Sequence, residues 1–176
     1  STLIILRGNS GSGKSSAARA LQQKIGRNTL LIPQDTIRRD LLWTKDGKDN
    51  GLPLLTDLLH YGHAHCEHVI LEGILNADWY LSLFETANKL FSGRIHAYYY
   101  DIPFEETLKR HATKDKRFEF GEAEMRRWWK EKDFIGIIPE KTFTETVSLE
   151  DAVDCILHDI SSEFKIEGGI FPSLYF

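Results

Sequence analysis

Residues 8–15 constrain the fold of this chain more than any other part of its sequence. They read Gly8-Asn9-Ser10-Gly11-Ser12-Gly13-Lys14-Ser15, a full match to the phosphate-binding pattern G-x-x-x-x-G-K-[ST]. An apolar run suited to a buried strand precedes them at residues 3–6, and helix-forming residues follow from Ser16. Strand, glycine-rich turn and helix in this order predict a loop whose backbone N–H groups surround a phosphate at a helix N-terminus.

The last residues of the pattern predict specific chemistry. The Lys14 ammonium neutralises the β- and γ-phosphates of a nucleoside triphosphate, and the Ser15 hydroxyl is a ligand for Mg²⁺. We therefore expect residues 8–15 and Ser16 to bind nucleotide, and Lys14 to take part in the reaction.

The composition fits one globular domain. Of the 176 residues, 41% are hydrophobic and 27% are charged, enough for a substantial core. We place the domain at residues 1–165, followed by an apolar tail at 166–176 that is a packed arm, a contact with a neighbouring chain or a remnant of cloning.

No apolar run approaches the ~20 residues that span a bilayer, and the first residues predict a strand and not a signal peptide, so we expect a cytoplasmic protein without a membrane partner. Cys66 and Cys155 are too few for a disulfide framework and are expected to be reduced, and the net charge of -4 gives no general attraction to nucleic acid.

Hydrophobic runs alternate with helical patterns along the chain. We predict strands at residues 3–7, 29–33, 68–72 and 95–101, and helices at 14–25, 36–43, 52–65, 77–91, 103–113, 121–131 and 149–160. This alternation predicts an α/β fold with a parallel sheet. Asp101 is expected to cap the helix that begins at Pro103, and Ser148 with Asp151 to form a capping box before the last helix.

Two acids follow predicted strands, where ligands of an open α/β sheet bind. Asp35 comes after the second strand and is a candidate base for an acceptor hydroxyl that faces the γ-phosphate; its alternative role is a helix N-cap. Glu72 ends the third strand and is a candidate for Mg²⁺, its waters or the acceptor, or else a solvated acid. Arg38 and Arg39, one turn beyond Asp35, face an anionic acceptor or lie on a plain surface.

Positive charge gathers between residues 107 and 127, where it predicts a lid over the triphosphate. The cations are Lys109, Arg110, His111, Lys114, Lys116, Arg117, Arg126 and Arg127. Among them we expect Arg110, Lys114 and Arg126 to contact the phosphates. The alternative is a solvated face, since Glu105 with Lys109 and Glu106 with Arg110 are spaced as helical ion pairs.

Two further clusters predict packing rather than chemistry. His60, His63, His65, Cys66 and His68 invite a metal site, but His63 and His65 point about 160° apart on a helix of 100° per residue, so we expect exposed helix histidines. Met125, Trp128 and Trp129 are expected to pack the lid helix.

Together, residues 8–15, the Asp35-x-x-Arg38 element, residues 69–73 and the Asp101-x-Pro103 helix leading to Lys109 resemble the small P-loop kinases. That group includes phage polynucleotide 5′-kinase, chloramphenicol phosphotransferase, zeta toxins and bacterial small kinases of unassigned substrate. The resemblance covers about residues 3–160. It implies a three-layer sandwich with a parallel five-stranded sheet in the order 2-3-1-4-5, ATP with Mg²⁺, and phosphorylation of a hydroxyl. It also implies that Asp35 is the base, that Arg38 contacts the acceptor, and that a short lid lies at about 114–127, since the long insert of adenylate-kinase-like enzymes is missing between residues 113 and 121.

The sequence therefore predicts an ATP-dependent kinase that acts on a hydroxyl of a small molecule or nucleotide. A polynucleotide 5′-hydroxyl kinase is the first alternative, because Arg38, Arg39 and the lid cations could hold phosphates. A non-catalytic nucleotide switch is the second, and it lacks support because no Asn-Lys-x-Asp guanine-reading motif is present. The acceptor and the oligomeric state are not predicted.

Overall fold

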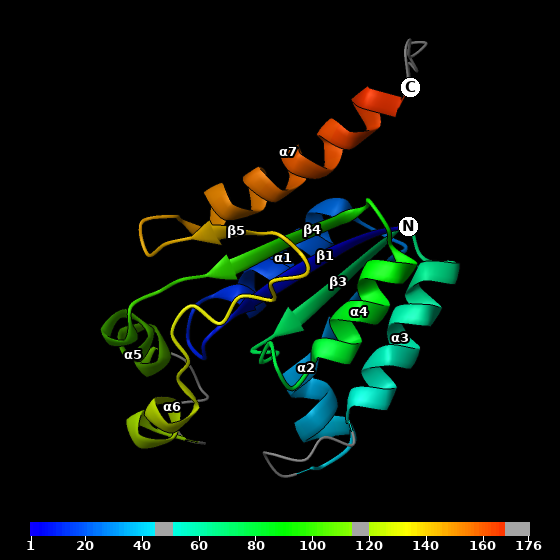
Figure 1. The fold of residues 1–176 in the computed structure, drawn as a ribbon. Helices are drawn as coiled ribbons and strands as arrows, with labels where there is room; N and C mark the ends of the chain where they lie inside the picture. The colour runs from blue at the N-terminus through cyan, green and yellow to red at the C-terminus, as the bar shows by residue number, and fades with distance from the viewer. Residues whose placement is uncertain (45–50, 114–119, 168–176) are drawn as a thin grey trace.

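Five parallel strands form the sheet at the centre of the protein (Figure 1). The structure is a computed structural model that describes residues 1–44, 51–113 and 120–167. The strands are β1 (Thr2–Gly8), β2 (Thr29–Pro33), β3 (His68–Gly73), β4 (Ile95–Tyr100) and β5 (Glu140–Phe143). Their order is β2-β3-β1-β4-β5, and every neighbouring pair is parallel. The expected fold class and strand order are confirmed, and all the carboxyl ends meet at one edge of the sheet.

Helices connect the strands and cover both faces of the sheet (Figure 1). They are α1 (Lys14–Ile25), α2 (Gln34–Thr36), the π-helical turn η1 (Ile37–Leu41), α3 (Gly51–His65), α4 (Leu81–Leu90), α5 (Phe104–Ala112), α6 (Glu122–Trp128) and α7 (Leu149–Glu167). The predicted bounds of α1 are confirmed. The predicted lid residue Lys114, together with Lys116 and Arg117, lies outside the described residues, as does the tail from residue 168.

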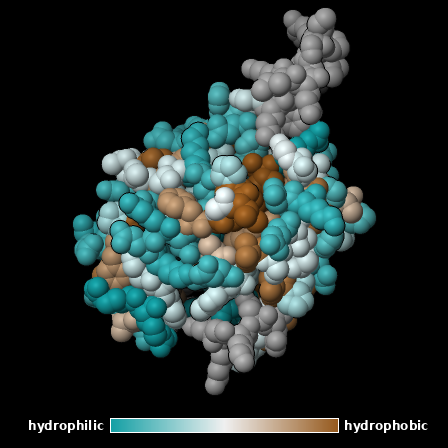
Figure 2. All heavy atoms as spheres, in the orientation of Figure 1, coloured by the Kyte–Doolittle hydropathy of each residue, from teal (hydrophilic) through white to brown (hydrophobic). Residues whose placement is uncertain are grey.

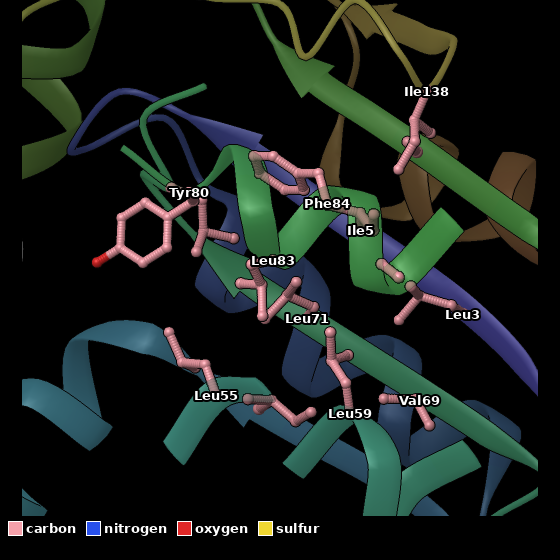
Figure 3. Packing of buried hydrophobic residues seen from close by; sticks show 14 of the residues in the cluster. Leu3, Ile5, Leu55, Leu59, Val69, Leu71, Tyr80, Leu83, Phe84 and Ile138 are labelled. Carbon is pink, nitrogen blue, oxygen red and sulfur yellow. The ribbon is translucent and has the colours of Figure 1, made fainter. Parts of the chain in front are cut away.

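Successive side chains of a strand point to opposite faces of the sheet, and the core is therefore divided into two clusters. Leu3 and Ile5 of β1 pack with leucines of α3 and with Phe84 of α4, as the close view in Figure 3 shows. Ile4 and Leu6 point to the opposite face, where they pack against α1 and α7. Each face of the sheet is therefore buried under two helices, as a parallel sheet requires.

The outer surface is mostly hydrophilic in the view of Figure 2, with hydrophobic side chains gathered near its middle. Among the described residues, Phe134 and Ile137, in the segment before β5, are large hydrophobic side chains that are 42% and 44% exposed. No helix in the described part of the chain is long and apolar enough to cross a membrane.

Four local predictions are wrong at their boundaries. The last helix, predicted at 149–160, continues to Glu167 as α7. The predicted helix 36–43 begins earlier, at Gln34, and continues from Ile37 as a π-helical turn. The predicted helix 121–131 ends at Trp128, because Trp129 is extended and the Lys130 backbone bonds to Asn9 instead. The helix predicted at 77–91 begins only at Leu81, after a turn.

The capping predictions have mixed outcomes. Asp101 does not cap α5, because the N-cap residue is Pro103, whose side chain has no hydrogen-bonding group. At α7 the Ser148 Oγ accepts a hydrogen bond from the Asp151 N–H at 3.1 Å, as predicted. The Asp151 carboxylate completes the pair by accepting from the Ser148 hydroxyl at 2.6 Å.

Candidate functional site

The predicted site residues come together at the carboxyl edge of the sheet. The register pairs Leu6 of β1 with Glu72 of β3, and Gly8 of β1 with Tyr100 of β4. Pro33, the last residue of β2, is also a partner of Glu72. The loop at residues 8–15 (the phosphate loop), the acid that ends β3 and the start of α2 are therefore neighbours, where α/β sheets bind ligands.

The backbone of the phosphate loop needs its glycines. Gly8 and Gly11 have φ angles of +141° and +78°, a region that side chains disfavour. A Cβ on Gly11 would lie 2.6 Å from the carbonyl oxygen of Thr107 in α5. The loop thus follows a path that only glycine permits, closely packed against α5.

The loop ends where α1 begins. Gly13, at the cap position, adopts a left-handed conformation, and its carbonyl accepts the first hydrogen bonds of the helix from Ser16 and Ala17. The N-terminus of α1 therefore directly follows the phosphate loop, the arrangement expected at an anion-binding helix N-terminus. The hydroxyl of Ser12 is also buried, and in the described part of the chain no hydrogen-bond partner reaches it. A buried polar group without a partner is costly, so a phosphate oxygen is a suitable ligand for this loop.

Lys14 and Ser15 occupy the positions that their predicted roles need. Lys14 is 6% exposed, and its Nζ donates to the carbonyl oxygen of Asn9 at 3.1 Å, which keeps the ammonium over the loop. The Ser15 hydroxyl donates to Oε1 of Glu72 at 2.6 Å. Glu72 is 5% exposed, so its alternative as a solvated acid is wrong. A hydroxyl and a carboxylate side by side are oxygen ligands of the kind that Mg²⁺ binds, and the residues present therefore fit this ion.

The negative charge of Glu72 also affects the pKa of its neighbour Tyr100. Tyr100 is buried, and this burial raises the pKa of its hydroxyl, an effect that the negative charge of Glu72 reinforces. The Arg110 charge opposes the shift. These influences place Glu72, Tyr100 and Arg110 in one electrostatic environment at the end of β4 and β3.

Asp35 lies just beyond the carboxyl end of β2, at the same edge of the sheet. It is half-buried in the first turn of α2, two residues after the partner of Glu72. The cap position of α2 is Pro33, so the alternative role of Asp35 as an N-cap is wrong. Arg38 and Arg39 follow in η1, a π-helical turn of the kind that often occurs at functional sites. The Arg39 guanidinium lies 5.2 Å from the ring centre of Phe120, just before α6.

Arg110 is in contact with the phosphate loop, whereas Arg126 is bound elsewhere. The Arg110 guanidinium donates to the carbonyl oxygens of Ser12 at 2.9 Å and Glu145 at 3.3 Å, and its Nε donates to Glu106. Arg126 pairs with Glu122 of its own helix at 2.8 Å and lies over the Phe104 ring. Of the two described residues that were expected to contact the phosphates, Arg110 therefore lies at the phosphate loop and Arg126 does not.

Sequence reasoning missed a buried charge network directly behind the loop. The Arg7 side chain is fully buried and donates to the Leu75 carbonyl, to Asp133 at 3.0 Å and to Glu140 at 2.9 Å. Asn9 makes two further hydrogen bonds with the backbone of Lys130. Hydrogen bonds therefore join the segment after α6 to Arg7 and Asn9, the residues on either side of Gly8. The sequence did carry a signal for this network, because Arg7 is a charged residue inside an otherwise apolar strand.

The two clusters predicted to be structural do pack as expected. His60, His63 and His65 are exposed on α3, with His63 against the Phe91 ring and His65 against Tyr61. Met125 is buried, Trp128 contacts Phe120, and Trp129 contacts Phe104.

Comparisons with known proteins agree with this geometry. Residues 1–77 match the family model of the chloramphenicol phosphotransferase-like proteins. A gluconokinase from Sinorhizobium meliloti 1021 superposes with a TM-score of 0.61 at 15% identity, covering 96% of this chain and 98% of its own. A shikimate kinase from Acinetobacter baumannii, solved with shikimate, gives 0.60 at 20% identity, covering 92% and 94%. The APS kinase of Mycobacterium tuberculosis, solved with AMPPNP and APS, gives 0.65 at 18% identity, covering 92% and 97%.

No curated protein sequence matches the chain significantly. At identities of 20% and below, the structural likeness concerns the fold, and the sequence match concerns the part of the chain that holds the phosphate loop, Asp35 and Glu72. The chain therefore has the fold of the small P-loop kinases, and its first 77 residues carry the sequence pattern of the chloramphenicol phosphotransferase-like proteins.

Proposed function

We propose that this protein is an ATP-dependent kinase that transfers the γ-phosphate to a hydroxyl of a small molecule or nucleotide. The observation that carries the proposal is the Ser15–Glu72 contact of 2.6 Å at the start of α1. It joins the last residue of the phosphate loop to a buried acid at the sheet edge, next to the strand that leads to Asp35. The residues that we propose to bind the nucleotide and the residue that we propose as the base therefore lie at one edge of the sheet, as phosphoryl transfer needs.

In this proposal each group has one task. The loop N–H groups and Lys14 hold the β- and γ-phosphates, and Arg110 adds positive charge from α5. Mg²⁺, held through Ser15 with Glu72 nearby, would neutralise charge that develops on the phosphates. Asp35 orients the acceptor hydroxyl and accepts its proton as the new oxygen–phosphorus bond forms. The bond between the γ-phosphorus and the bridging oxygen breaks, and ADP leaves.

The acceptor side carries both signs of charge. In this proposal Asp35 of α2 faces a hydroxyl of the acceptor, and Arg38 and Arg39 of η1 attract an anionic part of it. A compact polar acceptor fits this mixture better than a polynucleotide, because the net charge of -4 opposes binding of a long polyanion. Arg126 is proposed to approach the phosphates only when nucleotide is bound, and Lys114 is proposed as a further phosphate contact.

Replacing Lys14 with alanine is expected to weaken binding of Mg²⁺·AMPPNP roughly 10- to 100-fold, the usual worth of a charged hydrogen bond. Lys14 is buried over the loop, so a surface cation cannot take its place. Isothermal titration with the wild type and Lys14→Ala measures the difference. Arg19→Ala, an exposed cation on the same helix, is the matched control and should bind as the wild type does. Equal affinity in Lys14→Ala and Arg19→Ala would show that the phosphates bind elsewhere.

Nucleotide binding is expected to slow hydrogen exchange in α5 and α6. Arg110 already bonds to the loop, and Gly11 packs on the backbone of α5, so a bound triphosphate should draw these helices together. Exchange measured by mass spectrometry with and without Mg²⁺·AMPPNP should show protection in residues 104–112 and 122–128, and none in α3. Unchanged exchange in both helices would rule out this closing movement.

A further inference from the structure

A second cluster of reactive side chains lies away from the phosphate loop, between the edge strand and the last helix. Lys141 of β5 donates from Nζ to the Sγ of Cys155 in α7 at 3.0 Å. The same ammonium reaches both carboxylate oxygens of Asp159, at 3.1 and 3.4 Å. Both elements are regular and lie side by side (Figure 1). The amine and the thiol are therefore held in contact by the fold.

The surroundings favour reaction at this thiol. Cys155 is half-buried, Lys141 is 53% exposed, and Lys141 and Asp159 line an open pocket of about 360 Å³, so a small oxidant can enter. A cation next to a thiol favours the thiolate, which is the form that reacts with peroxide. Asp159 is farther from the sulfur, at 3.8 Å, and its charge is directed to Lys141 and to the hydroxyl of Tyr98.

The neighbouring side chains also determine whether Lys141 is protonated. Hydrogen bonds to Cys155 and Asp159 raise the pKa of Lys141, so the amine is an ammonium at neutral pH. Partial burial pushes the pKa of Asp159 up, but hydrogen bonds from Lys141 and Tyr98 outweigh it and hold the pKa below its usual value. The carboxylate is therefore ionised and holds Lys141 as the ammonium, so Lys141 must lose a proton to solvent before it becomes a nucleophile.

We propose that Cys155 and Lys141 form an oxidation-sensitive pair that hydrogen peroxide converts into a covalent cross-link between β5 and α7. The thiolate first attacks one peroxide oxygen, giving a sulfenic acid while the peroxide is reduced to water. The Lys141 amine, after losing a proton to solvent, then attacks the sulfur. The nitrogen–sulfur bond of a sulfenamide forms, the sulfur–oxygen bond breaks, and the hydroxyl leaves as water. Contact at 3.0 Å gives the amine an advantage over nucleophiles in solution.

The cross-link would act on the loop that Arg110 contacts. Residues 142–154 lie between the two linked positions, and they include Glu145, whose carbonyl accepts from Arg110. Fixing both ends of this loop restricts the unfolded chain, so oxidation should raise the melting temperature by several degrees. The chemistry of the pair itself does not depend on the proposed kinase function.

Peptide mapping by mass spectrometry after treatment with hydrogen peroxide tests the proposal. The wild type should lose about 2 Da and yield a peptide pair joined through Cys155 and Lys141, which dithiothreitol separates. Lys141→Arg keeps the cation beside Asp159 but cannot form this link, so it should gain about 16 Da and react with dimedone at Cys155. Cys155→Ser should show neither change.

Cys66 is the matched control thiol, because it is also half-buried but packs against the apolar cluster under α3. Cys66→Ser should cross-link as the wild type does, and Cys155 should be oxidised roughly 10-fold faster than Cys66. The proposal is overturned if no joined peptide forms, if Lys141→Arg loses the same 2 Da (about two hydrogens), or if the two cysteines are oxidised at equal rates.

Discussion

Replacing Arg7 with methionine is expected to lower the free energy of unfolding by about 3–5 kcal/mol, the typical cost of removing one partner from a buried ion pair. Methionine fills a similar volume but removes the Arg7 partner of Glu140, which is 1% exposed, and leaves Asp133, which is 13% exposed, with Lys130 at 3.3 Å. Urea unfolding followed by circular dichroism measures the loss. Because Arg7 immediately precedes Gly8, the same variant should also bind Mg²⁺·AMPPNP more weakly under conditions where it is folded.

The control for Arg7 is an ion pair at the surface. Lys24 pairs with Asp154 at 2.8 Å, but both side chains are about half exposed, so solvent screens their attraction. Lys24→Met should leave the unfolding midpoint nearly unchanged. If Arg7→Met unfolds at the same urea concentration as Lys24→Met, then the buried network does not hold the phosphate loop to the segment after α6.

Replacing Asp35 with asparagine is expected to slow phosphoryl transfer by roughly 10²- to 10⁴-fold, the usual contribution of a positioned acid or base. Asparagine keeps the size of the side chain but removes its charge and basicity. Because no side chain caps α2, the substitution should not disturb the helix. The rate of transfer should therefore fall while the melting temperature and the affinity for Mg²⁺·AMPPNP stay close to those of the wild type.

Asp40→Asn provides the comparison for Asp35. Asp40 lies in η1, close in sequence, but its side chain is exposed. It should retain the wild-type rate of transfer. If Asp35→Asn transfers phosphate as fast as Asp40→Asn, Asp35 is not the base, and Glu72 becomes the next candidate because it lies at the same edge.

The parts of the fold that local sequence determines were predictable. Apolar strands buried on both faces read as continuous hydrophobic runs, and the bounds of β2 at Thr29–Pro33 follow from such a run. The phosphate loop was predictable because its glycines meet a backbone requirement that no other residue satisfies. The convergence of Glu72 with Ser15 follows from the parallel order, since a strand-end acid in such a sheet faces the same edge as the loop.

The features of the fold and of the site that were not predicted depend on contacts between residues that are far apart in the sequence. The residues alone indicated four strands, because Glu140–Phe143 is short and half charged, and it becomes a strand by pairing with the edge of β4. The strand count of five came only from the family resemblance. The partners of Arg7 lie 126 and 133 residues away, so no local pattern could identify them. Arg126 was a reasonable lid cation from sequence, but its helix supplies Glu122 as a nearer partner.

The most direct test of the account is acceptor-dependent formation of a phosphate ester. The protein is incubated with Mg²⁺ and γ-labelled ATP together with nucleosides, sugars, antibiotics or 5′-hydroxyl oligonucleotides, and labelled products are separated and identified by mass spectrometry. We expect a labelled small molecule or nucleotide, formed with one ADP for each product and strongly reduced in Asp35→Asn and in Lys14→Ala. ADP formation that no acceptor changes, or a labelled product that Asp35→Asn and Lys14→Ala form as fast as the wild type, would contradict it.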